Sequence, residues 1–451
     1  MTNSPTTDRS TTFYRTRSFC CDCQQLHEAA LRSENGAVAL DVYCPHGQQS
    51  APVSSDAATF RAVRAKSVLP EPCLDSARGF SWINILEITR DCNCKCPICF
   101  AESHPGAGGY LSVSDVELIA KRLKKEGLKA ISLSGGEPTL HPDLFDLVAA
   151  VRKRGLDVTL ISNGLLIGQD PALAEKIRKS GIIYIYLQLD TLRADVCKKI
   201  RGDELVETRK RALENVKKSG MHFGTNATIV RDNVEEVGAL LKHATEHVPN
   251  LAIVTFLTAG KTGRFLLDDA MLVTREDIIA SLIRSGEVEG LTVEHFWPFP
   301  RFAPLALDVH PDCAVLLPLA VDRGRIRPLE EYLDIARFFR RLGAARGGLN
   351  RAWAFVLFSW YFLLSIRPRG ILPMMRMLFG LVTQRGRSSL MTVVVEQFLH
   401  GLHQDQERVD RCTTCAVLED GQRVPMCVYQ HADPRRTKHT RIGEAHSSGN
   451  G

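Results

Sequence analysis

Residues 90–100 of this 451-residue chain read Arg-Asp-Cys-Asn-Cys-Lys-Cys-Pro-Ile-Cys-Phe. Directly before them lies the run 83–89, which has the β-branched composition of a buried strand. Within the quoted stretch, Cys92, Cys96 and Cys99 form the pattern C-x3-C-x2-C. Three thiolates can ligate three irons of a [4Fe-4S] cluster and leave the fourth iron open, whereas a closed zinc site requires four ligands. The stretch therefore predicts an iron–sulfur centre at the end of a β-strand.

Outward from this loop, β-branched runs alternate with charged segments of helical period from about residue 82 to residue 256. The candidate strands are 83–89, 130–134, 158–162, 183–189, 223–230 and 253–257. Ser112, with Asp115 three residues later, is typical of a helix start, and Gly127 and Gly155 are placed where helices should end. The alternation predicts an α/β fold, a partial (β/α)6 TIM-like barrel, in which loops at the carboxyl ends of strands carry the chemistry.

Composition divides the whole chain into five regions. The polar ends, 1–14 and 433–451, are predicted to be disordered tails. Residues 15–75 are predicted to form a small N-terminal Cys-rich metal knuckle, and 76–300 the partial barrel. Residues 301–432 are predicted to be a Cys-containing, mostly helical extension that holds an auxiliary cluster and covers the substrate.

The charge balance limits the partners that we expect. Lys and Arg number 57 against 51 Asp and Glu, a net charge of +6, which argues against a dedicated nucleic-acid binder. The first twenty residues lack the apolar core of a secretory signal. We therefore expect a reducing cytoplasm, where cysteines bind metals more often than they form disulfides.

The 14 cysteines fall into three groups with a few single residues left over. The N-terminal group predicts a zinc or a rubredoxin-like mononuclear iron site, with His46 as an alternative fourth ligand; its candidate ligands are Cys20, Cys23, Cys44 and Cys73. The C-terminal group predicts an auxiliary [4Fe-4S] cluster, with a structural zinc site as the alternative; its candidate ligands are Cys313, Cys412, Cys415 and Cys427. In the central loop, Cys94 lies two residues from both Cys92 and Cys96, and we interpret it as a bystander.

An arginine-rich, aromatic segment lies between residues 321 and 390, where the sequence has thirteen Arg, no Lys and four acidic residues. Inside it, the uncharged run 352–366 would make a helix of roughly 22 Å, shorter than the roughly 30 Å hydrocarbon core of a bilayer. Two interpretations stay open: a helix that contacts a membrane surface or a lipid, and a buried core helix with cationic ends.

The loop and the strand ends that follow it together resemble the radical S-adenosylmethionine (radical SAM) superfamily. Ser134-Gly135-Gly136-Glu137-Pro138 is similar to the GGEP motif of that family, and Ser162-Asn163-Gly164 to its TNG-type turn. The resemblance implies that Cys92, Cys96 and Cys99 hold the cluster. It also implies a set of SAM-binding residues: Gly135, Gly136, Glu137, Pro138, Ser162, Asn163, Gln188, Asp190 and Arg264.

The flanking motifs are similar to one branch of that superfamily, the tetraether lipid synthases and dihydropterin methyltransferases. These motifs are Cys20-x2-Cys23, Cys44-Pro45-His46-Gly47, His310-Pro311-Asp312-Cys313 and the run 420–429, Asp-Gly-Gln-Arg-Val-Pro-Met-Cys-Val-Tyr. The chain differs from the branch at Cys73, where the branch usually has Cys-Gly-x-Cys, and at Cys415, where relatives tend to have His.

The resemblance implies an enzyme that cleaves SAM reductively to a 5′-deoxyadenosyl radical, which abstracts hydrogen from an unactivated C–H bond. The leading hypothesis is C–C bond formation or alkylation on a lipid or isoprenoid substrate. The alternatives are methyl or aminocarboxypropyl transfer to a small polar molecule such as a pterin, and a non-enzymatic iron–sulfur or zinc protein. We expect a flavodoxin- or ferredoxin-type electron donor, and a cytoplasmic enzyme peripheral to the inner membrane face.

Overall fold

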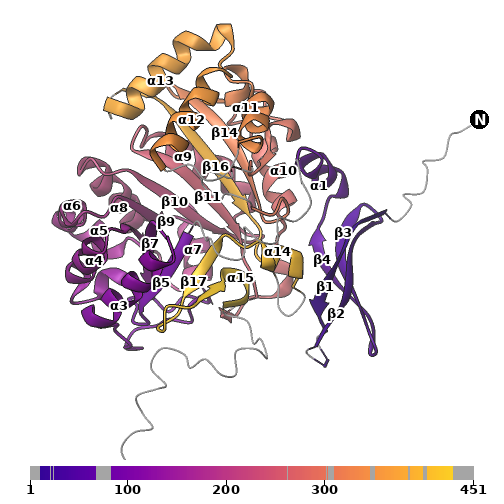
Figure 1. Cartoon of the computed structure of the whole chain (residues 1–451), viewed down its shortest axis with the longest axis horizontal. Coiled ribbons are helices and arrows are strands. Elements are labelled where there is room, and N and C mark those ends of the chain that lie inside the picture. The colour runs from indigo at the N-terminus through magenta and orange to yellow at the C-terminus, as the bar shows by residue number, and fades with distance from the viewer. Residues whose placement is uncertain are drawn as a thin grey trace, which may run out of the picture.

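A twelve-stranded sheet forms the centre of the molecule (Figure 1). The computed structural model describes residues 11–20, 22–23, 25–67, 83–261, 263–300, 302, 309–345, 351–383, 386–399 and 404–429. Six parallel strands lie side by side in chain order: β5 (Ile83–Thr89), β7 (Ala130–Gly135), β8 (Asp157–Ser162), β9 (Tyr184–Gln188), β10 (Phe223–Ile229) and β11 (Leu251–Thr258). All six predicted strands are present, which confirms the α/β fold of the partial-barrel type.

Helices connect these strands and cover the outside of the sheet (Figure 1). They are α3 (Val113–Lys125), α4 (Leu144–Lys153), α5 (Leu165–Gln169), α6 (Pro171–Ser180), α7 (Ala194–Arg201), α8 (Val206–Lys218) and α9 (Val237–Thr245). The predicted start of α3 is confirmed, because Ser112 and Asp115 form a reciprocal capping box. The buried side chains of these helices join those of the strands in one core that includes Leu123, Leu133 and Phe223.

The C-terminal region lengthens the same sheet at both edges. At one edge β16 (Ser388–Glu396) pairs parallel to β11, and β14 (Ala314–Asp322) follows antiparallel, with β15 (Arg325–Pro328) and β13 (Trp297–Pro298) beside it. At the other edge β17 (Thr414–Val417) pairs parallel to β5 and antiparallel to β18 (Arg423–Pro425). The predicted boundary near residue 300 therefore does not divide the sheet, and the strands of the extension were not predicted.

Helices of the C-terminal region lie at the top and front of the view in Figure 1. They are α11 (Ile335–Gly343), α12 (Arg351–Leu363), α13 (Ile371–Thr383), α14 (Gln406–Asp410) and α15 (Met426–Tyr429), and α10 (Arg275–Ser285) precedes them. Among the described residues, no helix is long and apolar enough to cross a membrane.

The N-terminal region is a small unit beside the main sheet (Figure 1). It is a four-stranded antiparallel sheet of β1 (Thr11–Phe19), β2 (Leu26–Glu34), β3 (Ala37–Cys44) and β4 (Gly47–Ser54), followed by α1 (Ala57–Arg64). This corrects the prediction of a disordered tail through residue 14, because β1 begins at Thr11. The predicted tail 433–451 and Cys73 lie outside the described residues.

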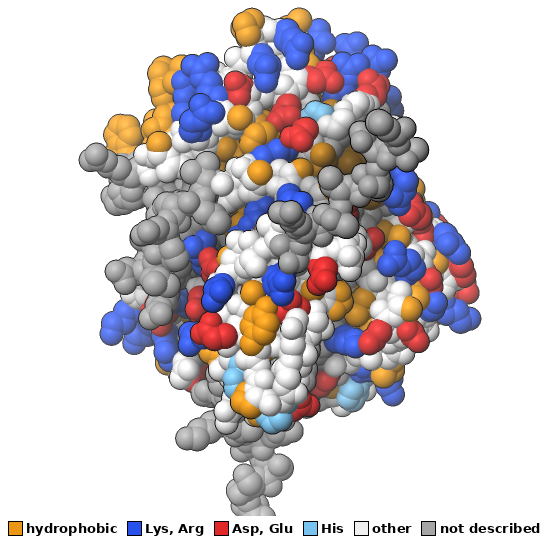
Figure 2. Space-filling view, turned by 90° about the vertical axis from the view of Figure 1, so that its right-hand side faces the viewer, with side chains coloured by type: hydrophobic (Ala, Val, Ile, Leu, Met, Phe, Trp, Pro, Cys, Tyr) orange, Lys and Arg blue, Asp and Glu red, His pale blue; other side chains and the backbone are white. Residues whose placement is uncertain are grey.

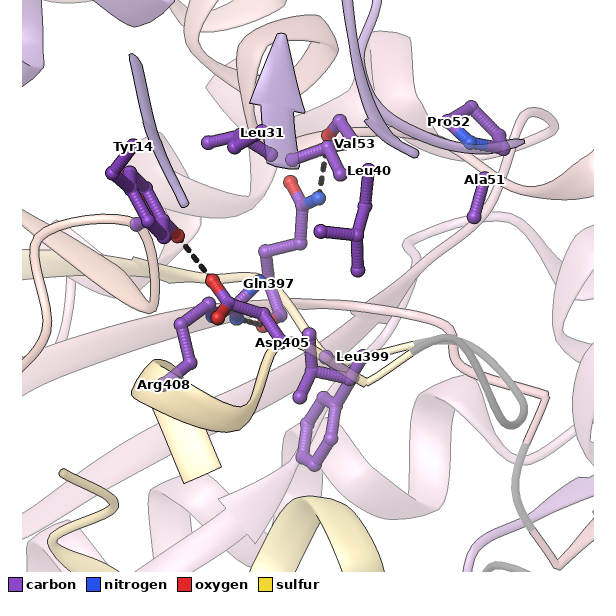
Figure 3. A pocket seen from close by; sticks show the side chains of 12 residues that line it. Tyr14, Leu31, Leu40, Ala51, Pro52, Val53, Gln397, Leu399, Asp405 and Arg408 are labelled. Carbon is purple, nitrogen blue, oxygen red and sulfur yellow. Dashed lines mark hydrogen bonds between the residues drawn. The ribbon is translucent and has the colours of Figure 1, made fainter. Parts of the chain in front are cut away.

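A seam of buried polar side chains joins this N-terminal unit to the C-terminal region (Figure 3). The Tyr14 hydroxyl donates to the carboxylate of Asp405, and Gln397 Nε2 donates to the Val53 carbonyl oxygen at 2.6 Å. Arg408 Nη2 in turn donates to the Gln397 carbonyl oxygen at 2.6 Å. These side chains line a small, mostly apolar cavity between the two regions. These hydrogen bonds therefore hold the N-terminal sheet against Gln397, the residue that directly follows β16.

Candidate active site at the carboxyl edge of the sheet

The cysteine loop leaves the carboxyl end of β5, as the sequence predicted. Cys92, Cys94 and Cys96 are each 8% exposed, Cys99 is half-buried, and all four are free thiols. They pack in one apolar cluster with Leu165 at the start of α5 and with Leu205 and Val206 at the start of α8. The three predicted cluster ligands thus share a shell that excludes water, and Cys94 lies in the same shell.

The charges around the loop favour the thiolate form of some of these cysteines. A hydrogen bond from the Cys94 side chain lowers the pKa of Cys96 to about 6; burial opposes this shift, and the positive charges of Arg201 and Arg209 assist it. The same thiol lowers the pKa of Cys92, whereas burial raises the pKa of Cys99. Because the thiolate is the form that binds metal, the loop is electrostatically suited to hold iron.

Asp190, which follows β9, anchors a buried ion-pair network beneath the loop. Its carboxylate accepts hydrogen bonds from Arg201 Nε at 2.8 Å, Arg201 Nη2 at 2.6 Å and Arg209 Nη1 at 2.9 Å. The backbone N–H of Thr228 donates a further bond at 2.9 Å. Arg201 Nη1 also donates to the carbonyl oxygen of Ile98, between Cys96 and Cys99, at 3.0 Å. Asp190 therefore positions the cysteine loop through Arg201.

This network differs from the role that the sequence assigned to Asp190. The prediction placed its carboxylate against SAM, but the carboxylate is fully buried and both oxygens are bonded to arginines. Burial raises the pKa of Asp190, but the two arginines outweigh it and hold the pKa below its usual value. Gln188 belongs to the same network, because its Oε1 accepts from Arg209 Nη2 at 3.1 Å.

Glu137 connects the ends of β7 and β8. Its Oε1 accepts from Thr139 N at 3.1 Å and from Ser162 Oγ at 2.8 Å, and its Oε2 accepts from Asn163 N at 2.8 Å. Burial raises the pKa of Glu137, and these hydrogen bonds oppose the shift. The carboxylate, predicted to bind SAM, is completely buried and holds two predicted SAM-binding turns together.

The two glycines before Glu137 are required by the cysteine loop itself. A Cβ atom on Gly135 would lie 2.1 Å from the Thr89 carbonyl oxygen, and one on Gly136 would lie 2.1 Å from that of Asp91. The backbone N–H groups of Gly136 and Glu137 donate to these same oxygens at 2.8 Å. The absence of side chains at Gly135 and Gly136 thus lets this backbone approach the cysteine loop closely and fixes the loop against β7.

Two other predicted cofactor residues also contact the cysteine loop. Asn163 Nδ2 donates to Asn93 Oδ1 at 2.7 Å and lies 3.9 Å from Cys92 Sγ. Arg264, in β12 (Arg264–Phe265), donates from Nε to the Cys96 carbonyl oxygen at 2.7 Å and from Nη2 to that of Ser103 at 2.8 Å. The structure therefore brings the predicted residues together around the loop; Pro138 begins the short helix after Glu137.

Sequence reasoning missed Arg201 and Arg209. Arg209 is 2% exposed and occupies the buried stripe of α8 together with Val206, Leu213 and Val216. An arginine at an apolar position of an amphipathic helix is the signal that could have identified it, because a buried charge requires a partner.

The four C-terminal candidate ligands come from separate segments: Cys313 precedes β14, Cys412 precedes β17, Cys415 lies in β17 and Cys427 in α15. The Cys412 thiol lies within electrostatic reach of those of Cys427, Cys313 and Cys415, and its pKa is raised by burial and by these neighbours. Burial raises the pKa of Cys313 to about 12, although the buried guanidinium of Arg408 opposes this shift. A tetrathiolate metal site at these four residues stays a prediction, because the described thiols of Cys412 and Cys415 donate to backbone carbonyl oxygens.

The C-terminal motif also reaches the central loop. The ring of Phe100, directly after Cys99, stacks on Tyr429 with 6.4 Å between centroids. The Tyr429 hydroxyl donates to Glu87 Oε2 on β5 at 3.1 Å. Cys427, two residues before Tyr429, is thereby tied to the strand that leads into the central loop.

The N-terminal candidate ligands meet in the turns after β1 and β3. One ligand atom each of Cys20, Cys44 and His46 lie within 4.8 Å of one another, and Cys20 Sγ is 3.7 Å from His46 Nδ1. Burial raises the pKa of Cys20, but hydrogen bonds from Cys23 and Cys44 outweigh it and lower the pKa to about 6. Cys20, Cys44 and His46 therefore form a three-ligand donor set that suits zinc, whereas Cys23 Sγ lies 3.2 Å from His27 Nε2. Because Cys73 lies outside the described residues, the choice between His46 and Cys73 as a ligand stays a prediction.

The central donor set fits an open [4Fe-4S] cluster better than a closed metal site. Three loop thiols converge in an apolar shell, two buried arginines supply positive charge, and the loop is fixed from three sides by Gly136, Arg201 and Arg264. A parallel sheet with such a loop at its carboxyl edge defines an iron–sulfur enzyme of the partial-barrel class.

Comparison with known proteins identifies a radical SAM domain within the chain. Residues 86–244 match the radical SAM superfamily, whose enzymes use a [4Fe-4S] cluster and SAM. The chain is 27% identical to the 7,8-dihydro-6-hydroxymethylpterin dimethyltransferase of Methanocaldococcus jannaschii, over 72% of this chain and 71% of that protein. It is 29% identical to the Fe-coproporphyrin III synthase of Methanosarcina barkeri, over 52% of this chain and 60% of that protein.

Among solved structures, the chain is similar to Streptococcus suis SuiB bound to S-adenosylmethionine, with a TM-score of 0.40 and 19% identity. The match covers 46% of this chain and 48% of SuiB. The chain thus spans about half of that protein.

Proposed function

We propose that this radical SAM enzyme abstracts hydrogen from an unactivated C–H bond in order to form a C–C bond or alkylate carbon, on a lipid or isoprenoid substrate. The observation that carries the hydrogen-abstraction step is the buried loop of Cys92, Cys96 and Cys99, which provides three ligands for a four-iron cluster. The lipid class rests on the apolar, arginine-flanked surface of the C-terminal helices.

In this proposal, Cys92, Cys96 and Cys99 hold the cluster, and the turns of Gly135–Pro138 and Ser162–Asn163 form the SAM cradle above it. When bound, the cluster supplies the electron that cleaves SAM to methionine and a 5′-deoxyadenosyl radical. Glu137 keeps the two turns in register, and Arg201 and Arg264 keep the loop carbonyls oriented. The apolar side chains of Leu165 and Leu205 exclude water from the reacting centre.

The same proposal assigns the outer cysteine groups. Cys313, Cys412, Cys415 and Cys427 would hold an auxiliary cluster, and Cys20, Cys23, Cys44 and His46 a zinc or single iron ion. The electron donor would be of the flavodoxin or ferredoxin type, and the enzyme would work in the cytoplasm at the inner face of the membrane.

A second candidate function is methyl or aminocarboxypropyl transfer from SAM to a small polar molecule such as a pterin. The match to a protein named as a hydroxymethylpterin dimethyltransferase favours it, because that match extends over 72% of this chain. The two candidates predict different products from SAM.

The test is anaerobic reconstitution with iron and sulfide, followed by addition of SAM and dithionite and identification of the nucleoside product. We expect 5′-deoxyadenosine, which should disappear in the Cys92→Ala, Cys96→Ala and Cys99→Ala variants. The matched control is Cys197→Ala, because Cys197 is buried in the same apolar cluster but lies on α7. Methylthioadenosine as the main product would instead favour aminocarboxypropyl transfer.

A further inference from the structure

We propose that the outward faces of α12 and α13 form a docking element that binds an anionic phospholipid bilayer. This inference deepens the proposed function, on which its biological role rests, by naming the surface through which a lipid-modifying enzyme would attach to a bilayer.

Helix α12 presents large apolar side chains to solvent along most of its circumference. Trp353, Phe355, Val356, Trp360 and Leu363 are between 52% and 70% exposed. Only Ala354 is fully buried among the α12 side chains that the structure describes. A helix of an ordinary core would carry polar side chains on its outer face, so the sequence interpretation of a buried core helix does not hold for this surface.

Helix α13 continues the same surface. Its inner face packs on the sheet through Met374 and Met377, whereas Leu372, Phe379 and Val382 are 59%, 65% and 81% exposed. At the level of these helices, the face drawn in Figure 2 shows hydrophobic side chains beside Lys and Arg, with some Asp and Glu among them. Exposed large apolar side chains on two neighbouring segments of the chain are typical of an interaction site.

The charge around the two helices identifies the partner as anionic. From residue 335 to residue 395 the sequence has ten Arg, no Lys and no acidic residue. These ten positive charges exceed the net charge of +6 of the whole chain, so the rest of the chain carries a net negative charge. Arg337, Arg340 and Arg376 are exposed, and none of them pairs with an acidic side chain in the described part of the chain. Apolar side chains ringed by unpaired cations match a leaflet of anionic lipids.

The geometry indicates insertion at the surface. Helix α12 has 13 residues and is about 20 Å long, too short for the roughly 30 Å hydrocarbon core. Strand β16, nine residues or about 30 Å long, leads from the end of α13 to the carboxyl edge. The docking element thus holds the enzyme on the bilayer and does not itself line the candidate active site.

The experiment is flotation of the full chain with vesicles of phosphatidylcholine containing about one third phosphatidylglycerol, compared with phosphatidylcholine alone. It is done without SAM or reductant, so its outcome is independent of the proposed reaction, which 5′-deoxyadenosine formation tests separately. We expect binding to the anionic vesicles only, together with a blue shift of tryptophan fluorescence from Trp353 and Trp360.

Two variants and their controls test the two parts of the surface. Arg337→Glu/Arg340→Glu/Arg376→Glu should weaken vesicle binding by about 100-fold or more, since each basic residue near the surface contributes about 1 kcal/mol. Phe355→Ser/Phe379→Ser should weaken it by at least about tenfold. The controls change equally exposed side chains elsewhere and should bind as the wild type does: Lys121→Glu/Lys125→Glu/Lys176→Glu and Leu118→Ser/Leu266→Ser.

Three results overturn the proposal. The first is a wild-type chain that does not float with anionic vesicles. The second is binding that the docking variants and the controls weaken equally. The third is a concentration-dependent dimer in analytical ultracentrifugation that Phe355→Ser/Phe379→Ser dissociates, because the apolar face would then be a contact between two copies of the chain.

Discussion

Replacing Asp190 by Asn tests whether the buried ion-pair network supports both the barrel and the cysteine loop. The side chains of Asp190, Arg201 and Arg209 are 0%, 6% and 2% exposed, so water cannot compensate a lost bond. In the variant an amide NH2 replaces one carboxylate oxygen, and on the Oδ2 side it would face the donors Arg201 Nε and Arg209 Nη1. Two buried cations then lose their counter-charge.

The expected cost follows from those contacts. Each hydrogen bond between charged groups contributes about 1.5–3 kcal/mol, and breaking a buried pair by removing one partner costs about 3–5 kcal/mol. For a domain of this size, 1 kcal/mol corresponds to about 2–4 °C in melting temperature. We therefore expect the barrel transition to fall by about 10 °C in calorimetry. Hydrogen exchange should increase in β9, β10 and the loop around Ile98, because Arg201 donates to the Ile98 carbonyl oxygen.

The matched control is Asp195→Asn, which removes an exposed carboxylate that pairs with Arg193 on the protein surface. It should leave the melting temperature unchanged, because water screens this pair. If Asp190→Asn melts within about 2 °C of the wild type and its hydrogen exchange near Ile98 is unchanged, the network does not position the loop.

Three further predictions address single residues. Cys94→Ser should retain the iron content and the electron paramagnetic resonance signal of the central cluster, whereas Cys92→Ser should lose both; equal loss in the two variants would make Cys94 a ligand. Glu137→Gln turns an amide group toward the Asn163 N–H and should weaken SAM binding about tenfold or more in equilibrium dialysis, because a buried group left without a partner costs about 1–3 kcal/mol. Glu126→Gln on the surface is the control. Unchanged SAM binding in Glu137→Gln would contradict the role given to Glu137. Burial, assisted by His243 and Lys217, lowers the pKa of His247 from 6.5 to about 3, so the unfolded chain binds a proton that the folded chain does not. The free energy of unfolding should therefore fall as the pH drops from 6.5 toward 3, and His247 should account for a loss of about 2 kcal/mol at pH 5. The His247→Phe variant should lack this part of the acid sensitivity, whereas the control His104→Gln should keep it.

The sequence predicts the barrel well because its strands are short runs of mostly apolar residues whose buried side chains join one core. β5, for example, reads Ile-Asn-Ile-Leu-Glu-Ile-Thr and was predicted with the bounds that the structure shows. The N-terminal sheet was not predicted, because its first strand has the opposite, polar composition. The outward side chains of β1 are polar, so Thr11 and Thr12 have the composition of a disordered tail until pairing with β2 satisfies their backbone groups.

The candidate site, like the fold, could be predicted only in part from the sequence. The spacing of Cys92, Cys96 and Cys99 is local, and it predicts the loop without knowledge of the fold. The partners of Asp190 lie 11 and 19 residues away on two helices, and only the folded sheet brings them to one point. The apolar run in α12 could not be distinguished from a core helix by sequence, because hydrophobic composition does not reveal whether another element covers it.

The pairing of β17 with β5 has a consequence for the order in which this protein matures on the ribosome. β5 is the first strand of the barrel to be made, yet its outer neighbour begins at Thr414, near the end of the chain. At about 5–20 residues per second, translation needs roughly 20–60 s to travel from one strand to the other. During that interval the open backbone edge of β5 is available to a foreign strand. A nascent or truncated chain that ends before residue 414 should thus depend on chaperones in a way that the completed protein does not.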